Sequence, residues 1–154
     1  MKIIQSCWTC NQPNLLQFKA GWVSPEYNLM SWALSCLQLK RYYSNVLLYA
    51  DSISASMLID KLGLPYTNVF CDLDKLNGYH TQLWALPKLH TYAQQETSFL
   101  HVDSDVFIWE KFDDKLLRGA SQYLSVLVAI NEFNLVAAAI NDLLMVCKYS
   151  AQSK

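Results

Sequence analysis

Hydrophobic positions fall into short continuous runs that alternate with longer runs of helical spacing. Each short run predicts a strand, and the four runs are Lys2–Ser6, Asn45–Ala50, Thr67–Cys71 and Ser98–Val102. The longer runs each predict a helix, and they cover Tyr27–Tyr43, a segment from Ser52 to Leu62, and Thr81–Gln95. This alternation predicts an α/β fold, with a Rossmann-like, mostly parallel sheet and flanking helices joined by right-handed crossovers.

Several residues predict where the helices begin and end. Ser52 can cap the second helix, and Gly63 followed by Pro65 predicts its end. Pro87 marks either a first turn or a kink in the third helical segment. The residues after the fourth strand change in character, because Gly119–Lys154 is an apolar segment that reads as helical or mixed.

Composition and charge narrow the function classes. Of the 154 residues, 53% are hydrophobic and 16% are charged, so the chain can build its own core. The formal net charge is -1 and no block of like charges occurs, which argues against binding DNA or RNA. Polar residues interrupt the apolar segment after Gly119, so we expect no transmembrane helix. The first residues lack the apolar core of a secretion signal, and we expect a cytoplasmic protein.

The five cysteines form an odd and scattered set, which is typical of free thiols in a reducing compartment. Cys7 and Cys10 have the C-x-x-C spacing of a redox motif or of half a zinc site. A thioredoxin-like motif needs a helix to begin at the pair, whereas residues 11–14 read as a loop. The sequence therefore favours free thiols.

Acidic residues follow three of the four predicted strands. They are Asp51, Asp72 and the pair Asp103 and Asp105, and the carboxyl ends of parallel strands share one edge of a sheet. On an extended chain Asp103 and Asp105 point the same way, so two carboxylates would repel unless a cation lay between them. Oxygen ligands favour Mg²⁺ or Mn²⁺, which commonly also bind substrate phosphates. Asp72 and Asp74 repeat the spacing, but they precede a polar loop and read as solvated acids.

Two stretches carry a resemblance to a known family. Leu83–Leu89 includes the basic residue Lys88, and Phe99–Phe107 is a hydrophobic strand that runs into Asp103-Ser104-Asp105. Together they resemble the nucleotide-sugar glycosyltransferases of the GT-A fold, similar to families 8 and 32 and to uncharacterised bacterial relatives. The layout is similar over residues 1–118, and the specific part is Leu83–Phe112.

The resemblance implies a divalent cation, Mn²⁺ or Mg²⁺, a nucleotide-diphosphate sugar as donor, and a glycan, lipid or protein acceptor. It implies that Asp105 binds the ion, that Asp103 binds the ion or the donor ribose, and that Lys88 meets a phosphate. It further implies that Trp8 and Thr9 hold the base and that Asp51 touches the base or ribose. The residues by themselves leave alternatives open, because Trp8 also suits a core, Asp51 a helix N-cap and Lys88 a solvated helix surface.

We therefore expect residues 1–118 to form a nucleotide-sugar-binding domain and residues 119–154 to be a foreign or incomplete apolar segment. Such a chain would be a truncated glycosyltransferase, or a minimal domain that associates with a copy or partner through the apolar segment. One alternative is a non-catalytic nucleotide-binding or interaction domain derived from the same fold. Another is a haloacid-dehalogenase-like phosphatase with Asp103 as nucleophile, which is disfavoured because Phe107 stands where that motif has Thr or Val.

Overall fold

The computed structural model describes residues 1–10, 12 and 14–113. The chain divides into two compact units, Met1–Lys111 and Phe112–Lys154, and all the elements below belong to the first unit. The predicted apolar segment from Gly119 onward lies outside the described residues. No helix in the described part of the chain is long and apolar enough to cross a lipid bilayer.

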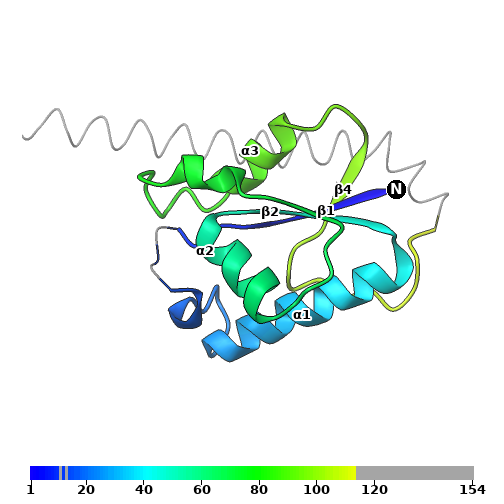
Figure 1. Ribbon diagram of the computed structural model, residues 1–154, viewed down its shortest axis with the longest axis horizontal. Helices are drawn as coiled ribbons and strands as arrows, with labels where there is room; N and C mark the ends of the chain where they lie inside the picture. Colours follow the sequence, from blue (N-terminus) through cyan, green and yellow to red (C-terminus); the bar gives the residue numbers. More distant parts are fainter. Residues whose placement is uncertain (11, 13, 114–154) are drawn as a thin grey trace, which may run out of the picture. The chain divides into compact units, whose positions relative to one another are not determined.

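A four-stranded, all-parallel sheet forms the centre of the first unit (Figure 1), which confirms the predicted α/β class. Its order is β3-β2-β1-β4. Each strand lies within one residue of its predicted bounds. The strands are β1 (Lys2–Cys7), β2 (Asn45–Ala50), β3 (Asn68–Phe70) and β4 (Phe99–His101).

Three helices connect the strands. They are α1 (Pro25–Tyr42), α2 (Ser52–Ala55), which continues as a π-helix over Ser56–Lys61, and α3 (Leu86–Ala93). Two short 3-10 helices, η1 (Leu15–Gln17) and η3 (Asp72–Leu76), lie in the loops. The third helix is shorter than the predicted Thr81–Gln95, because Pro87 occupies its first turn, where a missing backbone N–H costs nothing.

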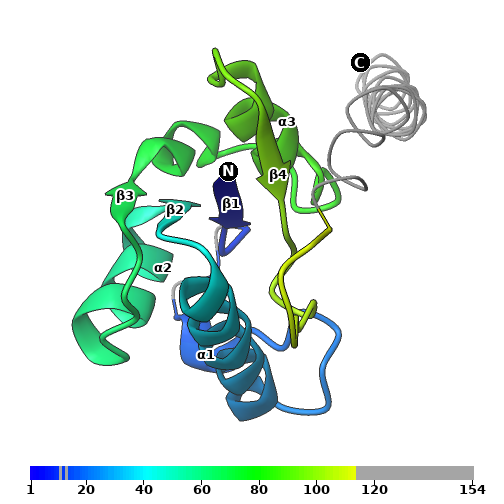
Figure 2. The ribbon, with the colours of Figure 1, turned by 90° about the vertical axis from the view of Figure 1, so that its right-hand side faces the viewer.

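Core residues cover both faces of the sheet. Figures 1 and 2 show α1 and α2 on one face and α3 with the segment of η3 on the other. Alternate residues of β2 serve the two faces, as the period of a strand requires, with Leu48 and Ala50 in one cluster and Leu47 and Tyr49 in the other. Burial on both faces explains why β2 reads as one continuous apolar run.

The strand order reverses between β1 and β4. From β1 the chain moves outward to β2 and β3, and then crosses back to place β4 on the other side of β1. The register aligns Ile4 with His101, and the Val102 N–H donates to the Ile4 carbonyl at 2.9 Å. In open α/β sheets such a reversal is the point where ligands bind, beyond the carboxyl ends of the strands.

Candidate functional site

The Asp103-Ser104-Asp105 segment forms a turn directly beyond β4 at this reversal. The strand ends at His101, and the Val106 N–H donates to the Asp103 carbonyl at 3.1 Å. The expectation of an extended chain through Asp103 and Asp105 is therefore wrong, because Ser104 and Asp105 belong to the turn. The acidic pair nevertheless lies at the predicted edge of the sheet.

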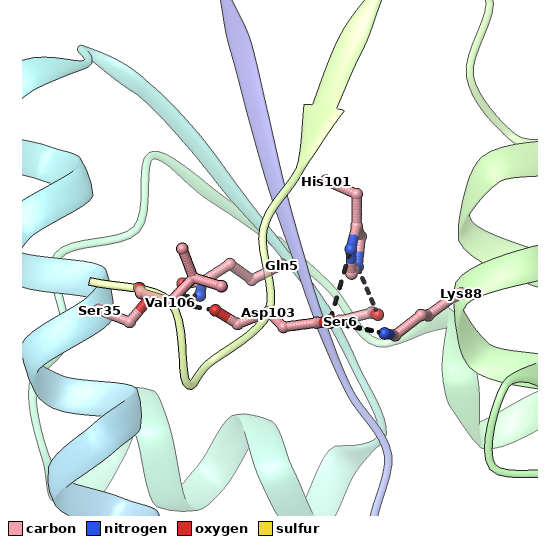
Figure 3. A network of polar contacts seen from close by, with 7 residues as sticks. All are labelled: Gln5, Ser6, Ser35, Lys88, His101, Asp103 and Val106. Atoms are coloured by element: carbon pink, nitrogen blue, oxygen red, sulfur yellow. Dashed lines mark hydrogen bonds and ion pairs between the residues drawn. The ribbon is translucent and has the colours of Figure 1, made fainter. Parts of the chain in front are cut away.

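A relay of buried polar side chains holds this turn (Figure 3). The Ser35 hydroxyl on α1 donates to the Val106 carbonyl at 2.8 Å and lies 3.4 Å from the Asp103 carbonyl. Gln5 on β1 donates to the Ser35 oxygen at 3.0 Å and accepts from the Tyr66 hydroxyl at 2.7 Å. Sequence reasoning missed these residues. The sequence contained one signal for this relay, the glutamine within the apolar first strand, because a buried polar side chain needs hydrogen-bond partners.

Lys88 and Asp103 form an ion pair at the site. The ammonium of Lys88, from the first half of α3, lies 2.7 Å and 2.8 Å from the two carboxylate oxygens of Asp103. Both side chains remain partly exposed, 26% for Lys88 and 47% for Asp103. Trp84, an exposed indole, lies beneath the same ammonium, with 5.8 Å between the nitrogen and the ring centroid. The structure thus brings together Lys88 and Asp103, two of the predicted site residues.

His101 lies behind the ion pair, and its side chain is 9% exposed. Its Nε2 is 2.9 Å from the Ser6 hydroxyl. Its ring lies edge-on to the ring of Tyr92, with 5.2 Å between the two ring centroids. Its Nδ1 is 3.7 Å from Asp103, too far for a hydrogen bond. Burial lowers the pKa of His101 to about 4, with the charge of Asp103 opposing this shift and that of Lys88 adding to it. His101 is therefore neutral at pH 7.

Asp105 is exposed on the same turn and has no hydrogen bond or ion pair within the described residues. The positive charge of Lys88 balances the negative charge of Asp103, and His101 is neutral. The carboxylate of Asp105 therefore leaves these four side chains with one net negative charge. An excess of carboxylate oxygens at a ligand-binding edge favours a cation. No cluster of three or more His, Cys, Asp or Glu side chains suitable for a metal occurs in residues 1–10, 12 and 14–113. A cation here would need additional oxygen ligands.

Trp8, Thr9 and Asp51 were predicted to contact the donor, but the structure encloses them. The Trp8 ring is 4% exposed and packs in the core. Asp51, 1% exposed, accepts from the Thr9 N–H at 2.7 Å and hydroxyl at 2.6 Å, and from the Ser54 N–H at 2.7 Å. These bonds tie the end of β1 to the start of α2. The alternatives of core residue for Trp8 and helix N-cap for Asp51 describe this structure, and Asp51 replaces Ser52 as the cap.

The second D-x-D pair has local partners. Asp72 pairs with Lys75 at 2.9 Å, and Asp74 accepts hydrogen bonds from the backbone N–H of Ser52, at 2.9 Å, and from its hydroxyl. These bonds from Ser52 lower the pKa of Asp74. Asp74 thus supports the first turn of α2.

The C-x-x-C pair lacks the properties of a redox centre. Burial raises the pKa of Cys7 to about 12, although a hydrogen bond with Ser54 partly opposes the shift. Burial and the charge of Asp51 raise the pKa of Cys10 to about 11. Reactive cysteines need the opposite shift, because the thiolate is the nucleophile.

A shallow depression of about 350 Å³ lies apart from this turn, between η1 and the start of α2. Lys61 is the one charged side chain in its lining, which also includes Asn14, Ile53 and Met57. It therefore lacks the carboxylate and lysine combination found at Asp103. The turn beyond β4 remains the better candidate for chemistry.

Comparison with known proteins yields a family but no characterised relative. No curated protein and no solved structure matches the chain, so the resemblance to glycosyltransferases stays a prediction. One family model matches residues 1–127. On this match the chain belongs to DUF6734, a family of unknown function.

Proposed function

We propose that this domain binds the diphosphate of a nucleotide sugar, together with Mn²⁺ or Mg²⁺, at the turn beyond β4. The observation that carries the proposal is the Lys88–Asp103 ion pair beside the exposed Asp105, where the strand order reverses. Ligands of open α/β sheets bind at such reversals. A diphosphate offers anionic oxygens to Lys88, and its cation offers positive charge to both carboxylates.

The charges of the site suit a cation that arrives with its ligand. Two carboxylates with a single lysine are too few to enclose a metal, and the described residues supply no third acidic, His or Cys ligand. Mg²⁺ and Mn²⁺ commonly complete their coordination with water and substrate phosphates. We therefore expect the metal and the diphosphate to bind cooperatively, and the metal alone to bind weakly.

Lys88 would exchange partners when the ligand binds. Its ammonium neutralises Asp103 in the structure described here. A cation bound by Asp103 would replace that positive charge and free Lys88 to meet a phosphate. Both side chains of the pair are partly exposed, so Lys88 can change its partner at the surface. The exposed face of Trp84, next to Lys88, offers a stacking surface for the base or sugar ring, a role predicted for the buried Trp8.

Sugar transfer would use this arrangement to stabilise the departing diphosphate. A divalent cation neutralises the charge that develops on the leaving group, and Lys88 adds a second positive charge. The alternative is a domain that binds the nucleotide without turnover. Release of free sugar or its transfer to an acceptor distinguishes the two, because either product requires the sugar–phosphate bond to break.

The test is calorimetric titration of the full chain with UDP and with GDP, with and without Mn²⁺. We expect at least one nucleotide to bind about tenfold more tightly with Mn²⁺, and Asp103→Asn/Asp105→Asn to abolish that gain. The matched control is Asp72→Asn/Asp74→Asn, which makes the same change in charge at the same spacing and should retain the gain. Binding that is absent, or indifferent to Asp103 and Asp105, would contradict the proposal.

A further inference from the structure

The outward face of α1 is apolar. Tyr27, Met30, Leu34 and Leu37 are exposed by 54%, 64%, 39% and 53%. From Tyr27 to Lys40 these four are the only α1 residues classed as exposed. Single exposed apolar residues are ordinary, but a continuous row of them marks an interaction surface.

The inward face of α1 carries buried polar residues that have hydrogen-bond partners within the domain. This face therefore packs in the interior, and the outward apolar residues are not core residues. Asn28 donates to the Phe18 carbonyl at 2.9 Å, and the Ser31 hydroxyl donates to the Asn28 carbonyl at 2.8 Å. Ser35 belongs to the relay that holds the Asp103 turn. The other buried residues of α1 are Trp32, Cys36 and Leu39. None of the four outward residues belongs to the described core cluster on this face of the sheet.

The spacing of the row is symmetric. Its members follow one another at intervals of three, four and three residues, the pattern of a coiled-coil seam. The row is about 15 Å long, since a helix rises about 1.5 Å per residue. A two-fold axis between Met30 and Leu34 would place Tyr27 against Leu37 of a second, antiparallel copy, and Met30 against Leu34.

The charges at the two ends of the row favour the same arrangement. Glu26 precedes the row, Arg41 follows it, and both are exposed. A hydrogen bond with Ser24 lowers the pKa of Glu26, so this carboxylate is ionised at pH 7. Antiparallel packing would bring Glu26 of each copy near Arg41 of the other, whereas parallel packing would bring like charges together.

We propose that the outward face of α1 is a self-complementary interface through which two copies of this chain form an antiparallel dimer. The symmetric row and the opposite end charges identify a second copy as the occupant. The dimer would not use the residues that hold the Asp103 turn, because Ser35 reaches that turn from the inward side of α1 and Lys88 lies on α3, across the sheet (Figure 2). Formation of this interface requires no bound nucleotide.

Sedimentation equilibrium of the full chain tests the proposal. The row is small compared with a standard interface, so we expect dimerisation with a dissociation constant of roughly 1–100 µM. Leu37→Glu should weaken the dimer at least tenfold, to about 1 mM in the weak case, because it buries a charge in the seam. The matched control is Leu16→Glu, at a leucine 52% exposed on η1, which should leave the mass distribution unchanged.

A charge swap tests the antiparallel orientation. Glu26→Arg and Arg41→Glu should each weaken the dimer about threefold, because each sets like charges opposite one another. The double variant should restore the original affinity. Circular dichroism establishes that every variant is folded. A monomer at all concentrations, or a dimer unaffected by Leu37→Glu, would overturn the proposal, and single swaps without rescue would overturn the antiparallel arrangement.

Discussion

Burial decides what each aspartate at the carboxyl edge of the sheet can do. Asp51 and Asp103 both follow a hydrophobic strand, and their local sequences suggest similar roles. Asp51 is 1% exposed and its oxygens accept three hydrogen bonds from Thr9 and Ser54. Asp103 is 47% exposed and pairs with one lysine. Only Asp103 can exchange its partner for a ligand without opening the core.

His101 should make stability depend on pH. The unfolded chain protonates this histidine below about pH 6.5, whereas burial delays protonation in the folded chain to about pH 4. The unfolded state therefore binds more protons in this window, and stability falls as the pH drops through it. Between pH 7 and pH 5 we expect His101 to account for a loss on the order of 2 kcal/mol in the free energy of unfolding.

Urea unfolding at the two pH values measures this loss. His101→Phe keeps a ring against Tyr92 but cannot titrate, so its free energy of unfolding should fall less between pH 7 and pH 5. His80→Gln, which replaces an exposed histidine, is unfolded in parallel as the control for removing a histidine elsewhere. Equal slopes for His101→Phe and the unmodified chain would show that His101 titrates normally.

At the scale of elements, two carboxylates accept hydrogen bonds from backbone N–H groups at the start of α2. Asp51 accepts from the Ser54 N–H, and Asp74, from the neighbouring 3-10 helix, accepts from the Ser52 N–H. The first backbone N–H groups of a helix lack partners within it, and the helix dipole favours negative charge there. Acidic residues at the ends of several strands suggested a cation site along this edge of the sheet. Some carboxylates at this edge, such as Asp51, instead stabilise the start of α2.

Replacing Asp51 should destabilise the junction between β1 and α2. Asp51→Ala leaves the buried N–H groups of Thr9 and Ser54 without acceptors, so we expect the free energy of unfolding to fall by about 3 kcal/mol. Asp51→Asn retains one carbonyl oxygen and should cost less. Asp72→Ala removes only a partly exposed pair with Lys75 and should change stability by less than about 0.5 kcal/mol. Equal effects of Asp51→Ala and Asp72→Ala would contradict this account of the junction.

At the scale of the whole molecule, residues 1–111 contain the described sheet and the helices that cover both of its faces. Core clusters lie on both faces of the sheet, and the relay from Tyr66 through Gln5 and Ser35 links β1, α1 and the turn beyond β4. The first unit thus has the interior that cooperative folding requires.

A chain that ends at Arg118 should keep its cooperative unfolding. We expect a single sharp thermal transition within a few degrees of that of the full chain, because the described core clusters lie entirely before this residue. Differential scanning calorimetry of the two chains makes the comparison. A broad transition, or binding of a hydrophobic dye by the shortened chain, would show that residues 119–154 contribute to the core.

The sequence by itself determined the order and class of the elements, because that information is local. Short apolar runs bounded by turn residues become strands, and the fully apolar Asn45–Ala50 becomes a strand buried on both faces. It also located Asp103 at the carboxyl edge of the sheet, since the carboxyl ends of parallel strands share one edge. The start of α3 was harder to predict, because a proline suits either a first turn or a kink.

Only the tertiary structure decided which polar residues meet. Lys88 and Asp103 are 15 positions apart, and Gln5 and Ser35 are 30 apart, so no local pattern records that they pair. The faces of α1 also required the fold, because apolar residues occur all around this helix and spacing alone does not tell which row faces the sheet. Asn28, Ser31 and Ser35 can lie on the buried side because backbone carbonyls accept a hydrogen bond from each of them, and Met30 and Leu34 lie on the exposed side.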